Sequence, residues 1–208
     1  LANGVFAIYR AAPPVAVMII GITGGSGSGK SALSALFAAA GFFVIDCDAL
    51  VHRLYGESKY INAVCAAFPE VRAEYGIDRK KLAAIVFSCP TELERLNKTV
   101  LPLISDAVMA EAEKGRGHRG IILDAPTLFE AGLDKKCDLV IGVIADEDIR
   151  IARIAARDGI SEAQAHARIS SQKSDEFYRT HCDFTVCNNG ARELCEVYSE
   201  LRKKIGVR

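Results

Sequence analysis

Short apolar runs alternate along this chain with longer stretches in which apolar residues recur every three or four positions. Apolar runs rich in β-branched residues are typical of buried strands, and the longer period is typical of helices packed on them. The alternation therefore predicts an α/β fold, with a mostly parallel sheet covered by helices on both faces. The runs predict five strands, at residues 15–23, 42–46, 120–126, 137–145 and 182–187.

Two intervals between the strands are longer than a single crossover helix requires. Residues 56–118 have helical periodicity and predict an accessory helical domain, in which Pro102 is expected to start a new helix or kink one. Residues 146–180 predict a helical hairpin, whose second helix begins at a capping box formed by Ser161 and Gln164. The other predicted parts are a core made of residues 17–55, 119–145 and 181–208, and an extension of unknown role at residues 1–16, with Met18 as an alternative start.

The segment "GITGGSGSGKSALSALF" (residues 21–37) stands between the first predicted strand and a helical pattern. Gly24, Gly29, Lys30 and Ser31 satisfy G-x-x-x-x-G-K-[ST], the phosphate-binding loop of nucleoside-triphosphate-binding proteins. A flexible linker would not require Lys-Ser at this fixed offset or a strand and a helix beside it. Lys30 is expected to reach the β- and γ-phosphates, and the Ser31 hydroxyl to ligate Mg²⁺. The residues predicted to bind the nucleotide here are Gly24, Gly25, Ser26, Gly27, Ser28, Gly29, Lys30 and Ser31.

Three carboxylates follow predicted strands at the edge of the sheet where ligands bind. Asp46 and Asp48 follow the second strand, and at least one of them is expected to orient a hydroxyl for attack or to handle a metal. The alternative is that one of them caps the next helix. Asp124 ends the third strand and resembles the acidic residue of the second nucleotide-binding motif, which supports Mg²⁺ directly or through water.

Arginines recur along the first helix of the predicted hairpin. Arg150, Arg153 and Arg157 have i, i+3, i+7 spacing, which places them on one face, and Arg168 lies on the second helix with Gln172 one turn on. Arginine stabilises the charge on a phosphoryl group in transfer. A mobile hairpin could move these arginines to the phosphates as water is excluded. The alternative is a solvated basic face.

Composition and charge narrow the classes of partner. The 26 basic and 26 acidic residues give a formal net charge of zero, which does not indicate a nucleic-acid or membrane surface, and no apolar stretch approaches a membrane span. Seven scattered cysteines without a C-x-x-C pair are typical of reduced thiols, so a cytoplasmic protein is expected. Neither the pair Cys182 and Cys187 nor the histidines form a metal-binding pattern. No obligate protein partner is predicted.

Five segments occur together in the order found in dephospho-CoA kinases: "GITGGSGSGKS", "DCDALVHRLY", "LDAPTLFE", "ARDGISEAQAHARISSQ" and "CDFTVCNNG". The chain resembles this family over residues 17–206. The resemblance implies a kinase that uses Mg·ATP to phosphorylate the ribose 3′-hydroxyl of dephospho-CoA. It also implies that residues 56–118 form the family's CoA domain and residues 146–180 its lid.

The resemblance assigns roles to individual residues. Asp48 matches the family's general base, the second Asp of its D-x-D, and Thr23 matches the threonine before the loop glycines. Arg157 and Arg168 match lid arginines, and Asn188 matches an asparagine near the nucleotide. The implied catalytic residues are Asp48, Lys30 and Arg157, and the implied acceptor-binding residues are Thr23, Asp48, His52 and Asp124.

The chain departs from the family pattern at two positions. Leu101 stands before Pro102 where the family often has His-Pro, and Thr127 stands in "PTLFE" where the family usually reads P-L-L-x-E. Both changes are expected to affect how the adenine or the pantetheine arm of the substrate is held.

Other classes of protein also have a phosphate-binding loop. Another kinase of nucleosides, nucleotides or small alcohols remains the alternative. A GTP-dependent switch is disfavoured because "NKTV" lacks the Asp of N-K-x-D and no D-x-x-G follows the third strand. A translocating ATPase is disfavoured by the balanced charge.

Overall fold

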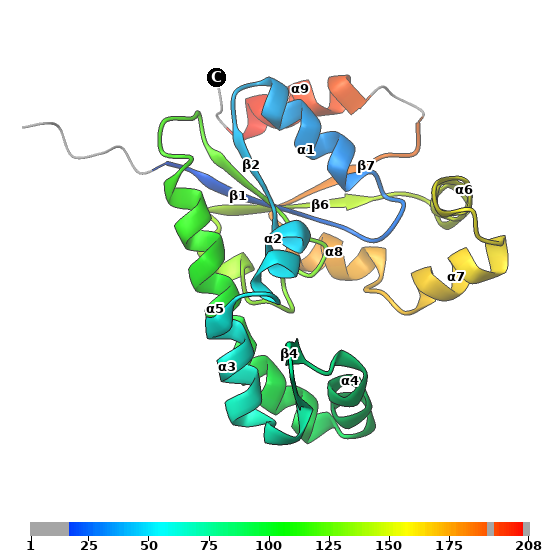
Figure 1. Cartoon of the computed structure of the whole chain (residues 1–208). Helices are drawn as coiled ribbons and strands as arrows, with labels where there is room; N and C mark the ends of the chain where they lie inside the picture. Colours follow the sequence, from blue (N-terminus) through cyan, green and yellow to red (C-terminus); the bar gives the residue numbers. More distant parts are fainter. Residues whose placement is uncertain (1–16, 191–193, 206–208) are drawn as a thin grey trace, which may run out of the picture.

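The computed structural model describes residues 17–190 and 194–205, so the extension predicted at residues 1–16 lies outside the described residues. A five-stranded sheet in the order β2-β5-β1-β6-β7 forms the centre of the molecule (Figure 1), and every neighbouring pair in it is parallel. The predicted fold class is confirmed. The strands are β1 (Ile19–Thr23), β2 (Phe43–Asp46), β5 (Ile121–Asp124), β6 (Leu139–Ile144) and β7 (Phe184–Cys187).

Helices cover both faces of the sheet because successive strand residues point to opposite sides. On one face, Ile20 and Ile22 pack in a cluster with residues of α1 (Lys30–Ala39) and α9 (Leu194–Lys204). On the other face, Ile45 and Leu123 belong to a larger cluster that includes residues of α2 (Cys47–Leu54) and continues into the helical segment. Figure 1 shows α1 and α9 together on one side of the sheet and α2, α5 and α8 on the other.

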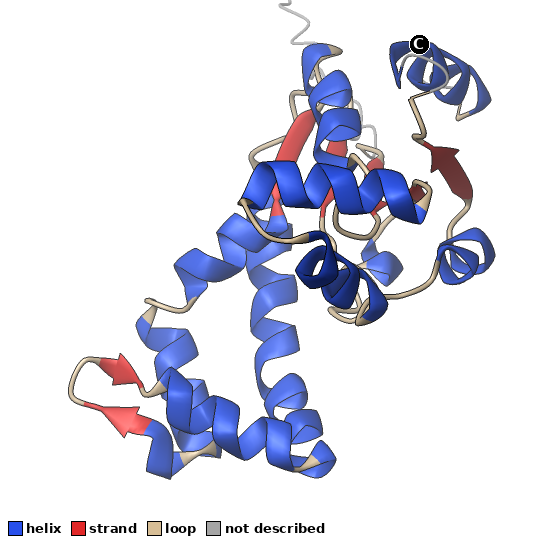
Figure 2. Ribbon diagram, turned by 90° about the vertical axis from the view of Figure 1, so that its right-hand side faces the viewer, coloured by secondary structure: helices blue, strands red, loops and turns tan. Residues whose placement is uncertain are grey.

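The interval at residues 56–118 contains α3 (Ser58–Ala67), the short 3₁₀ helix η1 (Pro69–Val71), α4 (Arg79–Ser88) and α5 (Pro90–Glu113). It also contains an antiparallel pair, β3 (Arg72–Ala73) and β4 (Gly76–Ile77), which lies at the far end of this segment in Figure 2. The prediction of helices alone was wrong here, because two-residue strands are too short to show an alternating pattern.

Pro102 lies inside α5, which continues from Pro90 to Glu113, so no new helix begins at this proline. The long helix connects the outer part of the helical segment with the sheet, as Figure 1 shows.

The interval at residues 146–180 begins with α6 (Glu147–Asp158) and α7 (Glu162–Ser170), which pack through Ile154, Ala165 and Ile169. Gly159 ends α6 with φ 65°, and Ser161 and Gln164 form the predicted capping box. A third helix, α8 (Asp175–His181), follows and packs under β6, a helix that the sequence pattern did not separate from the hairpin.

Candidate active site

The phosphate loop connects the end of β1 to the start of α1 and depends on glycine at positions where other residues would be strained. Gly24 has φ 151° and Gly29 has φ 94°. A Cβ added to Gly24 would lie 2.3 Å from the carbonyl oxygen of Val143, and one added to Gly29 would lie 2.0 Å from the amide nitrogen of Asn188. The loop is therefore packed directly against β6 and the segment after β7.

Side chains on the outer side of the loop bind its carbonyl groups. Arg150 Nε donates to Ser26 O at 2.9 Å, Arg153 Nη1 to Gly27 O at 3.1 Å, and Asn188 Nδ2 to Ser28 O at 2.8 Å. In a trans peptide the N–H points away from the carbonyl. The bonds to Ser26 O and Ser28 O therefore direct the N–H groups of Gly27 and Gly29 toward the inner side, beside the positive end of α1, where an anion binds favourably. The N–H of Ser28 donates instead to Gly25 O at 3.2 Å.

Lys30 and Asp124 form an ion pair at the inner side of the loop. Their side chains are only 15% and 11% exposed, so the lysine is already held next to the carboxyl ends of the strands. Ser31 is exposed in the first turn of α1. Thr23 is fully buried and donates to Pro126 O at 3.3 Å, which joins the end of β1 to the segment after β5.

The two carboxylates after β2 take different positions. Asp46 is the N-cap of α2 and accepts from Ala49 N at 2.9 Å, so the helix-capping interpretation is confirmed for this residue. Asp48 lies in the first turn of α2, and its side chain borders a cavity. Loss of hydration raises the pKa of Asp48, Lys30 opposes this, and the nearby carboxylates of Asp46 and Asp124 add to it.

The cavity beside Asp48 has a volume of about 400 Å³ and lies between α2, α5 and the segment after β5. His52 lines this cavity, and its ring lies edge-on to the ring of Tyr55, with 5.6 Å between the ring centroids. Leu101 and Thr127, the two departures from the family pattern, line the same cavity. A second cavity of about 480 Å³, farther along the helical segment, shares the lining residues Tyr55, Tyr60 and Leu96 with the first.

The four arginines singled out in the predicted hairpin separate into two pairs. Arg150 and Arg153 contact the phosphate loop, whereas Arg157 and Arg168 both bind the carboxylate of Asp158. The hydrogen bond from Arg157, together with Arg168, lowers the pKa of Asp158 to about 2. The spacing of Arg150, Arg153 and Arg157 predicted a shared face but did not indicate which side chains reach the loop.

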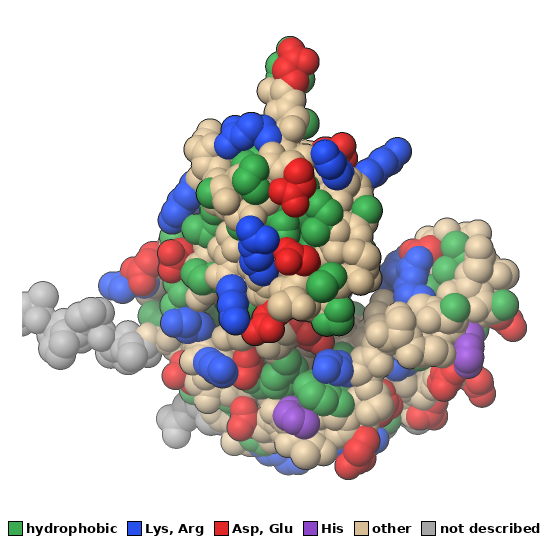
Figure 3. All heavy atoms as spheres, turned by 90° about the horizontal axis from the view of Figure 1, so that it is seen from below, with side chains coloured by type: hydrophobic (Ala, Val, Ile, Leu, Met, Phe, Trp, Pro, Cys, Tyr) green, Lys and Arg blue, Asp and Glu red, His purple; other side chains and the backbone are tan. Residues whose placement is uncertain are grey.

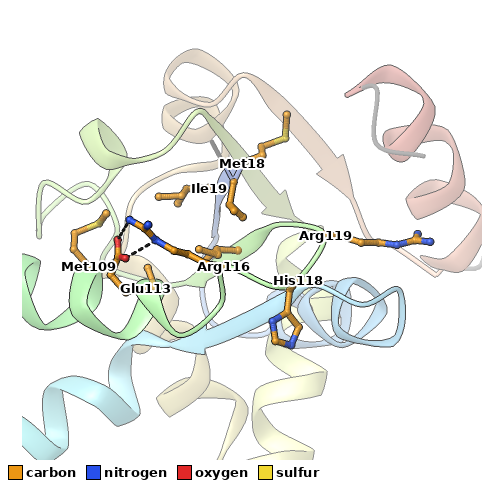
Figure 4. Close-up of a pocket in the computed structure, with 10 residues that line it drawn as sticks. Met18, Ile19, Met109, Glu113, Arg116, His118 and Arg119 are labelled. Atoms are coloured by element: carbon orange, nitrogen blue, oxygen red, sulfur yellow. Dashed lines mark hydrogen bonds and ion pairs between the residues drawn. The ribbon is translucent and has the colours of Figure 1, made fainter. Parts of the chain in front are cut away.

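A further cavity, of about 600 Å³, lies at the opposite edge of the sheet (Figure 4). It is lined by Ile19 and Ile121, which begin their strands, and its rim carries an ion pair between Glu113 and Arg116. It includes none of the residues predicted for the active site.

On the face shown in Figure 3, Lys and Arg side chains are interspersed with Asp and Glu side chains.

Comparison with known proteins identifies the family. A model of the family described as dephospho-CoA kinase matches residues 18–193. This chain belongs to the dephospho-CoA kinase family. The dephospho-CoA kinase of Geobacillus kaustophilus is 39% identical over 181 residues, which cover 85% of this chain and 90% of that protein. The Arabidopsis thaliana dephospho-CoA kinase is 35% identical over 89% of this chain and 81% of its own length.

Solved structures show the same fold. The crystal structure of TT1252 from Thermus thermophilus is 32% identical, covers 91% of this chain and 96% of its own, and has a TM-score of 0.73. A dephospho-CoA kinase structure from Campylobacter jejuni has a TM-score of 0.60 at 24% identity over 90% of this chain and 95% of its own, a likeness in fold. The resemblance and the fold of a P-loop kinase are confirmed. Within the described residues, no helix is long and apolar enough to cross a membrane.

Proposed function

We propose that this dephospho-CoA kinase transfers the γ-phosphate of ATP to the ribose 3′-hydroxyl of dephospho-CoA. The observation that carries the proposal is that the phosphate loop and the cavity beside Asp48 lie at the same edge of the sheet, with Lys30 close enough to act on Asp48, in a chain of this family. Its free cysteines are in keeping with a reducing, cytoplasmic location.

ATP would bind with its phosphates at the inner side of the loop, against the N–H groups directed there. Lys30 is paired with Asp124 beside this position. When ATP binds, the Lys30 ammonium would leave Asp124 and pair with the β- and γ-phosphates. The exchange requires little movement, because the side chain is already held beside the loop. Asn188 supports this site by holding the loop carbonyl of Ser28 rather than by facing the phosphates.

The acceptor would enter the 400 Å³ cavity with its ribose next to Asp48. In a loose phosphoryl-transfer transition state the hydroxyl loses its proton late, so the carboxylate mainly has to orient the oxygen and accept the proton as the bond forms. His52 lies on the same face of α2, and Leu101 and Thr127 line the same cavity. The second cavity adjoins the first through Tyr55, Tyr60 and Leu96, and its largely apolar lining suits the pantetheine arm. Residues 56–118 are thus assigned to acceptor binding.

The residues around the loop fit Mg²⁺, which takes oxygen ligands and is commonly held by substrate phosphates, waters and one or two protein oxygens. Among the described residues there is no group of three or more His, Cys, Asp or Glu side chains able to hold a metal, so the phosphates would supply most of the ligands. The Ser31 hydroxyl is the proposed protein ligand, with Asp124 supporting directly or through water. Bound there, the ion would neutralise charge on the β- and γ-phosphates.

Ser31→Ala is therefore expected to raise the Mg²⁺ concentration needed for half-maximal rate, and excess Mg²⁺ should restore part of the activity. The measurement is the rate as a function of Mg²⁺ at saturating ATP. Ser34→Ala, which removes a hydroxyl one turn farther along α1 that donates to Lys30 O, is the matched control. Equal Mg²⁺ requirements for Ser31→Ala and wild type would contradict the assignment.

Residues 146–180 are proposed to act as a lid, with Arg157 and Arg168 moving from Asp158 toward the transferring phosphate. Arg157→Ala is expected to lower kcat more than it raises KM, because the contact would form mainly in the transition state. Hydrogen exchange should show protection of α7 only when both substrates are bound. Equal hydrogen exchange of α7 with and without the substrates would contradict the proposal that these residues act as a lid.

The acceptor is tested by measuring ADP release from ATP with a panel of acceptors: dephospho-CoA, adenosine, AMP, shikimate and gluconate. Dephospho-CoA alone is expected to give rapid turnover. A faster reaction with a nucleoside or a small alcohol would favour the alternative, another kinase of this fold.

A further inference from the structure

One residue of the phosphate loop, Ser26, is held at three of its polar atoms by residues 150 and 172. Its N–H donates to Gln172 Oε1 at 2.9 Å, its Oγ accepts from Gln172 Nε2 at 2.8 Å, and its carbonyl oxygen accepts from Arg150 Nε at 2.9 Å. No other residue of the loop is held by as many side-chain bonds among the described residues.

The Gln172 side chain uses both ends of its amide in this contact. Its oxygen also accepts from Arg150 Nη2 at 2.9 Å, so the amide makes three hydrogen bonds. The residue lies two positions after the end of α7, in the connection to α8, and its own N–H donates to Ile169 O at 3.0 Å, which ties it to the end of α7. The hydrogen bonds therefore join the end of the proposed lid helix to the loop.

Arg150, which bonds to both Ser26 and Gln172, is itself held in place by burial and by Asp175. It is only 5% exposed, and Asp175 Oδ1 lies 3.6 Å from its Nη1. The backbone of Gly25 packs directly on the pair: a Cβ added there would lie 2.2 Å from Arg150 Nη2 and 3.0 Å from Gln172 Oε1. A side chain at residue 25 would force Arg150 and Gln172 away from the loop.

We propose that Gln172 is a positioning residue for the nucleotide, which sets the conformation of the loop at Ser26 and links it to the end of α7. Gln172 touches the loop on the side away from the proposed phosphate position, so it acts through the loop rather than on ATP. The N–H groups of Gly27 and Gly29 then face the phosphates before ATP arrives, and ATP does not have to order them. This inference rests on the nucleotide-binding part of the proposed function and not on the identity of the acceptor.

The amide is the chemical group that the contact requires. Methionine keeps nearly the same length but makes none of the three bonds. Glutamate can accept from Ser26 N and Arg150, but it lacks the Nε2 donor, so the Ser26 hydroxyl would have to turn and donate to the carboxylate. It also adds a negative charge near the proposed phosphate site. Gln172→Glu is therefore expected to weaken ATP binding at least as much as Gln172→Met.

The test is the affinity for ATP, measured by calorimetry in the absence of acceptor, together with hydrogen exchange of residues 24–29. Gln172→Met is expected to bind ATP about tenfold more weakly, with faster exchange of these loop amides, Ser26 first, because Gln172 accepts from its N–H. At saturating ATP, kcat should stay within about threefold of wild type, since the catalytic groups are intact.

Gln164→Met is the matched control. Gln164 also carries an amide on α7, but it bonds to Ser161 in the capping box and not to the loop. This variant should lower the thermal midpoint while ATP affinity and loop exchange stay at the wild-type level.

Gln172→Met that loses thermal stability but keeps wild-type ATP affinity and loop exchange would overturn the proposal, because Gln172 would then be a structural contact only. Faster exchange spread evenly over the whole chain would overturn it as well. A wild-type protein that binds ATP but does not phosphorylate dephospho-CoA would contradict the proposed function and leave this inference standing.

Discussion

Lys30→Met is expected to lower kcat by about 10³-fold. The physical reason is electrostatic: the Lys30 ammonium would lie where negative charge is concentrated on the β- and γ-phosphates, in a site with little solvent. Methionine keeps the length of the side chain and removes the charge. The measurement is single-turnover transfer from labelled ATP to dephospho-CoA.

Lys30 also neutralises Asp124, so a loss of activity has to be separated from a loss of folding. The Asp124 side chain is mostly buried, and removing its partner leaves an unpaired carboxylate there. The double variant Lys30→Met with Asp124→Asn removes both charges and should recover the thermal midpoint without recovering activity. If Lys30→Met instead turned over near the wild-type rate, the loop lysine would have no part in the chemistry.

Asp48→Asn is expected to lower kcat by about 10²–10⁴-fold, the range for a positioned general base, with ATP affinity little changed. Asparagine keeps the shape of the side chain but cannot accept the proton from the ribose hydroxyl. Asp46→Asn is the matched control two residues away. Because asparagine also caps helices well, that variant should keep the N-cap of α2 and nearly full activity.

The pH dependence gives a second, independent check on Asp48. Loss of hydration raises the pKa of Asp48, so the carboxylate should be lost, and kcat/KM should fall, at a higher pH than an ordinary aspartate would give. Since the folded protein holds this proton more tightly than the unfolded chain, ionised Asp48 lowers stability at neutral pH, and this penalty disappears as the pH falls through the raised pKa.

The raised pKa of Asp48 also predicts the thermal stability of Asp48→Asn. Asp48→Asn removes the ionised carboxylate, so its thermal midpoint at pH 7 should equal or exceed that of wild type while its activity falls. A normal rate for Asp48→Asn together with an inactive Asp46→Asn would show that the base is the other carboxylate.

Much of the fold and part of the site follow from the sequence because they depend on local patterns. The five strands are continuous apolar runs, and the phosphate loop needs glycine at Gly24 and Gly29 together with Lys30 at a fixed offset. The capping box at Ser161 and the turn at Gly159 are likewise set by residues close together in the chain. Local signals of this kind survive in the primary sequence, because the backbone conformation that they require involves few neighbours.

The tertiary structure alone decided which side chains meet. A spacing of three or four residues places Arg150, Arg153 and Arg157 on one face, but the docking of α6 on the loop determines that Arg150 and Arg153 reach it while Arg157 turns to Asp158. The bonds from Gln172 to Ser26 join residues 146 positions apart. Such contacts depend on the positions and rotations of whole helices, which arise from packing over the entire core and leave no periodic signal in the sequence.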